Sequence, residues 1–200
     1  MILEKYNKVF ICYKDTNLFL LYYLYLCYMK ITIFWLAGSG TSTIWKLLSE
    51  KTNFTFMSTW NIMRSWSEDM WYSIYQFEDK VVKNDSSFDL KLDEKVKLFW
   101  EENDNFIFES RLAWYFIPDS FKIYLDCGVD ERYRRIQNRE WLLLDEVIEK
   151  NEKRERELEI RYNKVYPNIT FPPLKTSFDL VIDGSNTPDE IVEEIMKNIN

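Results

Sequence analysis

The chain has 200 residues, 46% of them hydrophobic and 30% charged, and its formal net charge is −7. This length suits a single domain with one core, and the acidic balance argues against a nucleic-acid-binding surface as the main function. The chain has no histidine, so its chemistry relies on arginines, carboxylates, backbone amides and a bound cation. Three scattered cysteines, Cys12, Cys27 and Cys127, form neither a disulfide framework nor a zinc spacing, which favours a reducing, cytoplasmic setting.

The first 28 residues stand apart from the rest. Residues 17–28 (NLFLLYYLYLCY) are mostly apolar, but the run is shorter than the roughly 20 residues that a membrane-spanning helix needs. No small-residue cleavage site follows it, and Met29 directly precedes a predicted strand. We therefore expect residues 1–28 to be an N-terminal extension, or sequence upstream of a true start at Met29, and residues 29–200 to form the domain. A signal peptide or a membrane anchor is the alternative.

A strand, a loop of small residues and a helix follow. Residues 30–34 (KITIF) predict a buried strand, and residues 43–50 (TIWKLLSE) predict the first turns of a helix. The loop between them, residues 35–42, reads WLAGSGTS. In this context Gly38 and Gly40 allow backbone amides and the helix N-terminus to face a phosphate. A simple Gly/Ser turn is the alternative.

The loop matches the phosphate-loop pattern G-x-x-x-x-G-K-[ST] at two of its four defining positions. Gly40 is the second glycine, and Ser42 is the hydroxyl residue that would reach Mg²⁺. Thr41 stands at the lysine position and Trp35 at the first glycine position. The pattern therefore indicates a phosphate site with an unusual first residue.

Short strands and helices alternate along the remaining chain. Further strands are predicted at residues 54–57, 105–109, 121–125 and 178–182. Further helices are predicted at residues 61–68, 74–83, 89–102, 129–139, 145–164 and 188–199. The last helix has a clear start signal, with Thr187 as N-cap and Pro188 at its first position. This alternation predicts an α/β fold with a doubly wound, five-stranded parallel sheet flanked by helices.

Six segments, in order and at matching spacing, resemble one family. They are LAGSGTST (36–43), STWNIMR (58–64), DLKLD (89–93), ESRLA (109–113), KIYLDCGVDERYRRIQNRE (122–140) and FDLVIDGS (178–185). From Lys30 onward the chain is similar to the cytidylate kinases, particularly the short archaeal-type branch of the P-loop nucleoside monophosphate kinases. In that family the lysine of the loop is commonly threonine, which agrees with Thr41.

The resemblance implies a P-loop NTPase-type fold with two small subdomains. A region for binding the nucleoside monophosphate (NMP) would lie at about residues 58–104, and a lid at about residues 139–170. The implied reaction transfers the γ-phosphate of ATP to CMP or dCMP with Mg²⁺, in a monomer with no nucleic-acid or membrane partner. Two alternatives stay open: a catalytically silent nucleotide-binding protein of the same fold, and a small kinase with another acceptor, AMP or UMP.

The resemblance also implies the residues that bind phosphate. Those for ATP are Leu36, Ala37, Gly38, Ser39, Gly40, Thr41, Ser42, Thr43 and Arg139. Arg64 and Arg111 match positions that hold the acceptor phosphate. Arg154 and Arg161 lie seven residues apart, hence on one helix face, and resemble lid arginines. These four arginines are the predicted catalytic residues; surface ion pairs and a solvated charged helix are the alternatives.

Carboxylates complete the predicted site. Asp89 and Asp93 lie four residues apart on one helical face, where the resemblance implies recognition of the cytosine amino group or the ribose. Ser42 and, through a water molecule, Glu109 are the predicted magnesium contacts. For Glu109, a buried carboxylate paired with Arg111 at the end of a strand is the alternative.

Tryptophan falls where the family has glycine at five positions: Trp35, Trp60, Trp71, Trp114 and Trp141. The chain has only four glycines, whereas average usage predicts about 14, and it has eight tryptophans. Some bacterial lineages read the codon UGA as glycine, and translating such a gene with UGA as tryptophan gives this pattern. We therefore hypothesise that these five positions are glycines in the protein that the cell makes.

Overall fold

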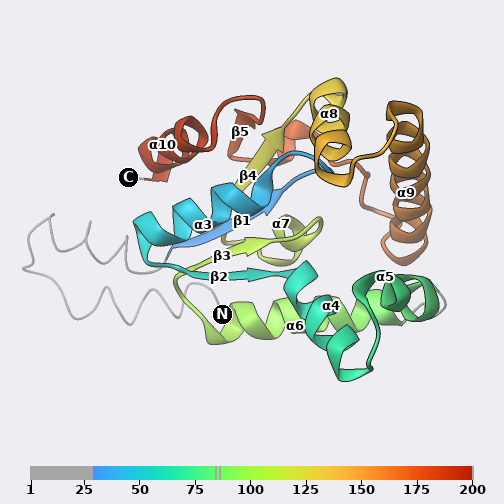
Figure 1. Ribbon diagram of the computed structural model, residues 1–200. Helices are drawn as coiled ribbons and strands as arrows, with labels where there is room; N and C mark the ends of the chain where they lie inside the picture. The colour runs from blue at the N-terminus through green and yellow to red at the C-terminus, as the bar shows by residue number, and fades with distance from the viewer. Residues whose placement is uncertain (1–28, 84, 86, 200) are drawn as a thin grey trace, which may run out of the picture.

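The structure, a computed structural model, describes residues 29–83, 85 and 87–199. The expectations for residues 1–28, including the start at Met29, lie outside this range. Among the helices of the described residues, none is both long and apolar enough to cross a membrane. Figure 1 shows a sheet with helices on both faces.

Five parallel strands form one sheet in the order β2-β3-β1-β4-β5. They are β1 (Lys30–Phe34), β2 (Thr55–Ser58), β3 (Phe106–Glu109), β4 (Phe121–Asp126) and β5 (Leu180–Asp183). The predicted doubly wound sheet is therefore confirmed. The central strands are buried on both faces, as their β-branched and aromatic residues predict for a parallel sheet.

Helices connect the strands. They are α3 (Thr41–Thr52), α4 (Thr59–Asp69), α5 (Ile74–Phe77), α6 (Phe88–Glu102), α7 (Ala113–Phe116), α8 (Val129–Glu140), α9 (Leu144–Val165) and α10 (Pro188–Ile199). The predicted cap of α10 is confirmed, because the Glu190 amide donates to the Thr187 hydroxyl at 3.4 Å and the Thr187 amide donates to the Glu190 carboxylate at 2.9 Å.

The structure differs from the prediction in three places. The helix predicted at residues 74–83 is split into α5 and a π-helical segment, Glu78–Val82. Phe77 and Val82, five residues apart, are both buried against one cluster, and a π-helical turn brings residues at that spacing onto one face. The short helix α7 and a 3₁₀ turn at Lys175–Ser177 were not predicted, because elements of three or four residues are too short to show a hydrophobic period.

Each face of the sheet packs against its own helices. On one face, Ile44, Trp45 and Leu48 of α3 pack with α10 against β1 and β4. On the other face, the aromatic residues of β3 pack against α6 and α7, and Phe34 and Tyr124 pack against α9. The described core is thus a sheet between two helical layers.

The topology determines where a ligand would bind. The chain runs from β1 to one edge of the sheet at β2, returns to β3 beside β1, and then crosses to β4 on the other side of β1. In open α/β sheets, ligands bind at the carboxyl ends of the strands where the direction of winding reverses. That point lies at the β1–α3 loop, and the strand arrows of Figure 1 point toward α4, α8 and α9.

Candidate active site

The β1–α3 loop has the geometry of an anion cradle. Gly38 and Gly40 have φ of 90° and 84°, in the left-handed region that favours glycine. Gly40 is the N-cap of α3 and supplies no side-chain cap, so the first-turn amides of α3 are available to an anion. A Cβ at Gly38 would lie 2.4 Å from the backbone oxygen of Arg132. The loop therefore needs glycine here for its conformation and for its close packing against α8.

Two arginines of α8 donate hydrogen bonds to backbone carbonyls of this loop. Arg132 Nη1 donates to the Ala37 carbonyl at 3.1 Å, and Arg135 Nη1 donates to the Ser39 carbonyl at 3.0 Å. Arg132 is buried and also pairs with Glu155 of α9 at 2.8 Å. These contacts satisfy loop carbonyls and connect the loop to α8 and α9 at once.

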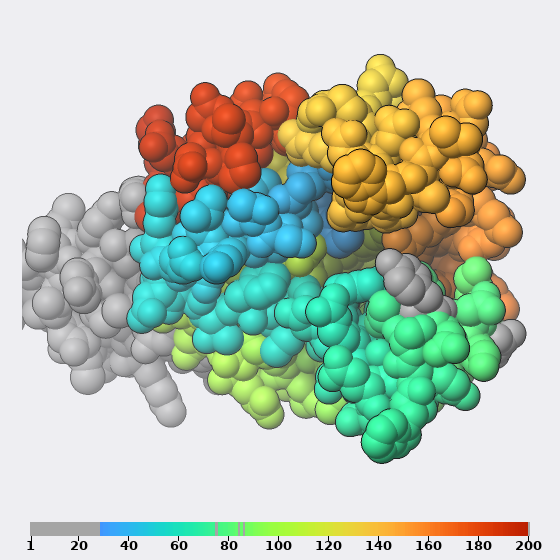
Figure 2. Space-filling model, in the orientation of Figure 1, coloured from blue at the N-terminus to red at the C-terminus, as the bar shows by residue number. Residues whose placement is uncertain are grey.

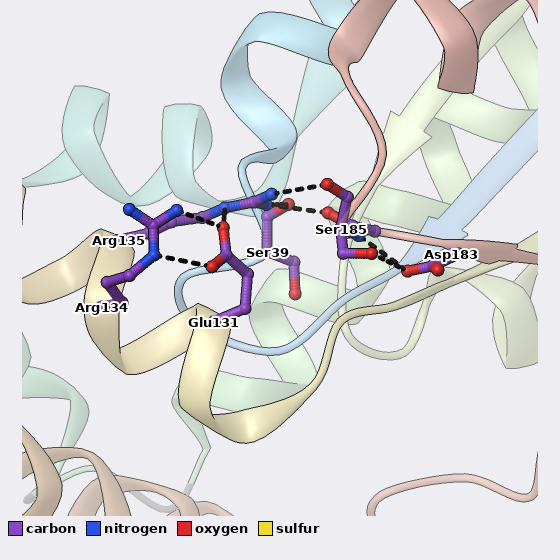
Figure 3. Close-up of polar contacts among 7 residues, drawn as sticks. Ser39, Glu131, Arg134, Arg135, Asp183 and Ser185 are labelled. Carbon is purple, nitrogen blue, oxygen red and sulfur yellow. Dashed lines mark hydrogen bonds and ion pairs between the residues drawn. The ribbon is translucent and has the colours of Figure 1, made fainter.

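Arg135 also joins the loop to the turn after β5. Its Nη1 donates to the Gly184 carbonyl at 2.9 Å, and its Nε donates to Glu131 at 2.7 Å (Figure 3). Arg134 and Arg135 both donate to Glu131, and these hydrogen bonds lower the pKa of Glu131 to about 2. A single guanidinium therefore bridges two loops at the carboxyl ends of β1 and β5.

Glu109 ends β3 close to the first turn of α3. It is buried, and burial raises its pKa to about 7, although the side chains of Thr41 and Trp45 and the charge of Arg111 act in the opposite direction. Thr41 is buried whereas Ser42 is exposed. The structure thus brings a buried carboxylate to the same turn of α3 as the predicted magnesium contact Ser42.

Three of the four predicted catalytic arginines gather beyond the strand ends. Burial lowers the pKa of Arg111 to about 10, and Arg154 is among the charges that act on it. Arg154 of α9 pairs with Glu78 at 3.4 Å, and Arg161 of α9 pairs with Asp89 of α6 at 3.1 Å. Figure 2 shows a hollow between the yellow and orange residues of α8 and α9 and the teal residues of α4. Helix α9 therefore carries two arginines to the side of the molecule where Arg111 lies.

The predicted acceptor carboxylates lie together on α6. Asp89 and Asp93 are both buried. Burial raises the pKa of Asp93 to about 7, with the nearby charge of Asp89 as a second cause. Burial also raises the pKa of Asp89, and the charge of Arg161 opposes this. Within the described residues Asp93 Oδ2 is buried and accepts no hydrogen bond, so a polar acceptor remains available at this position.

Two predicted phosphate contacts, Arg64 for the acceptor and Arg139 for ATP, are exposed in the structure. Arg64 lies exposed on α4. Arg139 is exposed and pairs with the adjacent Glu140 at 2.7 Å, whereas Arg132 and Arg135, on the same helix, contact the loop. The spacing Glu131-x-x-x-Arg135, an i,i+4 pair that fixes the guanidinium, was the available signal in the sequence.

Three of the tryptophans at expected glycine positions lie beside Arg111 or Arg154. The Arg111 guanidinium lies 5.5 Å from the centroid of the Trp35 ring, and that of Arg154 lies 5.9 Å from the centroid of Trp60. Trp114 Nε1 donates to the backbone carbonyl of Arg111 at 3.0 Å. Indole rings therefore occupy space next to the proposed phosphate-binding arginines.

The parallel sheet, the glycine loop at its winding reversal and the arginines beyond the strand ends define a P-loop kinase. Two solved structures share the fold. The shikimate kinase of Aquifex aeolicus aligns with a TM-score of 0.57 at 20% identity, covering 86% of this chain and 96% of that one. That of Bacteroides thetaiotaomicron aligns with a TM-score of 0.60 at 12% identity, covering 86% and 98%. At these identities the likeness concerns the fold alone.

Sequence relatives are more specific. A protein-family model described as an AAA domain matches residues 31–159. The cytidylate kinase of Methanobrevibacter smithii is 32% identical over 168 residues, which is 84% of this chain and 96% of that protein. That of Sulfolobus acidocaldarius is 34% identical over 173 residues, covering 86% and 93%. The chain belongs to the cytidylate kinase family.

Proposed function

We propose that this protein transfers the γ-phosphate of ATP to CMP or dCMP, giving CDP or dCDP and ADP, as a monomer in the cytoplasm. The single observation that carries the proposal is the identity of about one third to cytidylate kinases over nearly their whole length. The arrangement of the described residues is compatible with it, because phosphoryl transfer requires positioning and charge neutralisation more than covalent chemistry from the protein.

The donor phosphates fit the β1–α3 loop. Residues 36–43 supply backbone amides and the uncapped end of α3, and the contacts of Arg132 and Arg135 to loop carbonyls keep that shape in place before ATP arrives. Arg139 is exposed to solvent. In this proposal it would reach the phosphates of ATP only after the lid moves.

Magnesium fits the same turn of α3. Ser42 and Glu109 offer hard oxygen ligands, and a nearby cation would offset the burial that raises the pKa of Glu109. Among the described residues, no group of three or more acidic or cysteine side chains could hold a metal ion by itself. Mg²⁺ commonly uses one or two protein groups plus substrate phosphates, and it would neutralise charge on the transferring phosphoryl group.

The acceptor would lie between α6 and α9. Arg111 and Arg64 would bind its phosphate, and Asp89 and Asp93 would accept hydrogen bonds from the cytosine amino group or the ribose. Arg154 and Arg161 would bind the transferring phosphate when α9 closes over it. This closure requires exchange of their ion pairs with Glu78 and Asp89, so substrate binding and lid movement are coupled.

The test is a coupled assay of ADP release with CMP, dCMP, UMP and AMP as acceptors. It uses both the protein of the printed sequence and a variant with glycine at positions 35, 60, 71, 114 and 141. Turnover that is highest with CMP or dCMP supports the proposal. Turnover that is highest with AMP or UMP supports another small kinase, and ATP binding without turnover in both proteins supports the catalytically silent alternative.

A further inference from the structure

Two tryptophans adopt a backbone conformation that suits glycine. Among the described residues, the non-glycine residues with positive φ are Asn53, Trp71 and Trp141, at 58°, 59° and 55°. Asparagine visits this left-handed region readily, whereas a bulky side chain there is an outlier. Two of the three exceptions in the described chain are therefore bulky residues, for which this conformation is an outlier.

Trp71 occupies the glycine position of a Schellman motif. The Trp71 amide donates to the Glu68 carbonyl at 3.0 Å, and the Tyr72 amide donates to the Ser67 carbonyl at 2.9 Å. This pair of bonds, from the first and second residues beyond the helix cap back into its last turn, requires a left-handed residue, usually glycine, at the first of them. Helix α4 thus ends with the hydrogen bonds of a motif that usually has glycine at this position, but with a tryptophan side chain on the Cα.

Trp141 ends α8 in the simpler left-handed motif. Its amide donates to the Gln137 carbonyl at 2.9 Å, which is the single bond that defines this motif and places a left-handed residue just beyond the helix. The two helix ends therefore require the same backbone conformation through different hydrogen-bond patterns.

Packing does not compensate for either conformation. Trp71 is 94% exposed and Trp141 is 92% exposed, so neither indole gains burial that would offset its backbone cost. By contrast, Trp45 is 1% exposed and packs in the core. Nothing in the described structure favours an indole at position 71 or 141, and the backbone favours the absence of a side chain.

We infer that glycine occupies positions 71 and 141 in the protein that the cell makes, encoded by UGA read as glycine. A single reassignment, of UGA from tryptophan to glycine, accounts for both positions. It also accounts for a chain with four glycines and eight tryptophans. The two positions also lie where flexibility is useful, since residue 71 separates α4 from α5 and residue 141 separates α8 from α9. Glycine there permits the dihedral changes of a hinge.

The first test determines the codons and the residues directly. The codons for residues 71 and 141 are read from the gene. The masses of the tryptic peptides that contain these residues are measured by mass spectrometry on protein purified from the source organism. UGA codons with peptide masses that fit glycine support the inference. UGG codons overturn it, and so do peptide masses that fit tryptophan.

The second test measures stability and does not depend on kinase activity. At each position, Trp→Gly is compared with Trp→Ala, so that both variants lose the indole and only the tolerance for positive φ differs. Glycine is expected to raise the folded-to-unfolded ratio over alanine by roughly 5- to 30-fold at each site. The matched control is Lys46, exposed within α3, where alanine is expected to be the more stable. If the alanine variant is more stable than the glycine variant at positions 71 and 141, as is expected at Lys46, the inference is overturned.

Because this measurement follows unfolding, its result is separate from that of the acceptor assay. A protein that phosphorylates no nucleotide can still prefer glycine at both helix ends. An active kinase can equally show no such preference.

Discussion

The Arg111 guanidinium lies over the ring of Trp35 at 5.5 Å from its centroid. This contact joins the first residue of the β1–α3 loop to the proposed acceptor-phosphate arginine. Trp35 Nε1 is buried and has no hydrogen-bond partner among the described residues, so the indole is only partly accommodated. Because the indole lies against the guanidinium, we expect it to hinder a phosphate that approaches Arg111.

Replacing Trp35 by glycine is therefore expected to favour acceptor binding. A cation–π contact is worth about 0.5–2 kcal/mol, so removing it lowers KM for CMP by about 2- to 30-fold. Steady-state kinetics with varied CMP measures this. W35F keeps an aromatic ring over Arg111 and is the matched control. Equal KM values for W35G and W35F would show that the ring does not compete with the acceptor.

Arg135 is expected to affect ATP more than CMP. Its guanidinium donates to the carbonyls of Ser39 and Gly184, whereas a lysine can reach them only as a point charge. Losing one charge-assisted hydrogen bond, worth about 1.5–3 kcal/mol, is expected to disturb the β1–α3 loop, which would bind the phosphates of ATP. We expect R135K to raise KM for ATP about tenfold, with less than about a twofold change in KM for CMP.

The control for R135K lies one residue away on α8. Arg134 shares Glu131 with Arg135 but is exposed, and among the described residues its side-chain hydrogen bonds go to Glu131 and not to the loop. R134K is expected to leave both KM values near those of the parent. If R134K raises KM for ATP as much as R135K, the effect comes from α8 as a whole and not from the bridge.

Asp93 is expected to make stability depend on pH. Its folded-state pKa is raised from 3.8 to about 7, chiefly by burial, so the folded protein binds the proton more tightly than the unfolded chain. A raised carboxyl pKa contributes stability that is present at low pH and is lost as pH rises from about 4 to 7. D93N removes this titration and should gain stability relative to the parent over that range, by up to about 4 kcal/mol at 1.4 kcal/mol per unit.

Urea unfolding of D93N and the parent at several pH values tests this. Only the difference between the two curves is used, because other groups titrate in both proteins. E94Q is the control, since Glu94 is the next residue on α6 and is exposed. A difference between D93N and the parent that stays constant across pH 4 to 7 would exclude the proposed proton uptake by Asp93.

The sheet could be predicted because each strand is a short run of β-branched and aromatic residues, which periodicity detects. The β1–α3 loop could be located for the same reason, since Gly38 and Gly40 lie between a predicted strand and a predicted helix. The π-helical turn could not, because it depends on Phe77 and Val82 both packing against Phe88, and that contact exists only in the tertiary structure. The contacts of Arg132 and Arg135 with the loop cross more than 90 residues of sequence and were missed in favour of Arg139.

Position in sequence also did not reveal which carboxylates pair with which arginines. The sequence predicted Asp89 as a contact to the cytosine amino group or the ribose, and Arg161 as a lid arginine, without a contact between the two. In the structure they form an ion pair between α6 and α9 at 3.1 Å. A spacing of four or seven residues fixes a helix face, but the partner of that face depends on how two distant helices pack.

A double-mutant cycle on Asp89 and Arg161 is expected to show strong coupling. The Asp89 side chain is 6% exposed and that of Arg161 27% exposed, so R161Q alone leaves a buried carboxylate unpaired, at a cost of about 3 kcal/mol. The double variant D89N/R161Q removes both charges and is expected to recover part of that loss, with a coupling of about 1–3 kcal/mol.

The exposed pair Arg156–Glu152, an i,i+4 contact within α9, is the control for that cycle, with an expected coupling of about 0.3–0.5 kcal/mol. Denaturant unfolding of all variants gives both couplings. Since closure of α9 would separate Asp89 from Arg161, adding CMP and an inert ATP analogue should reduce the first coupling and leave the second unchanged. A coupling that persists with both nucleotides bound would mean that the pair is a fixed strut between α6 and α9, and Arg161 would then be unavailable to the transferring phosphate.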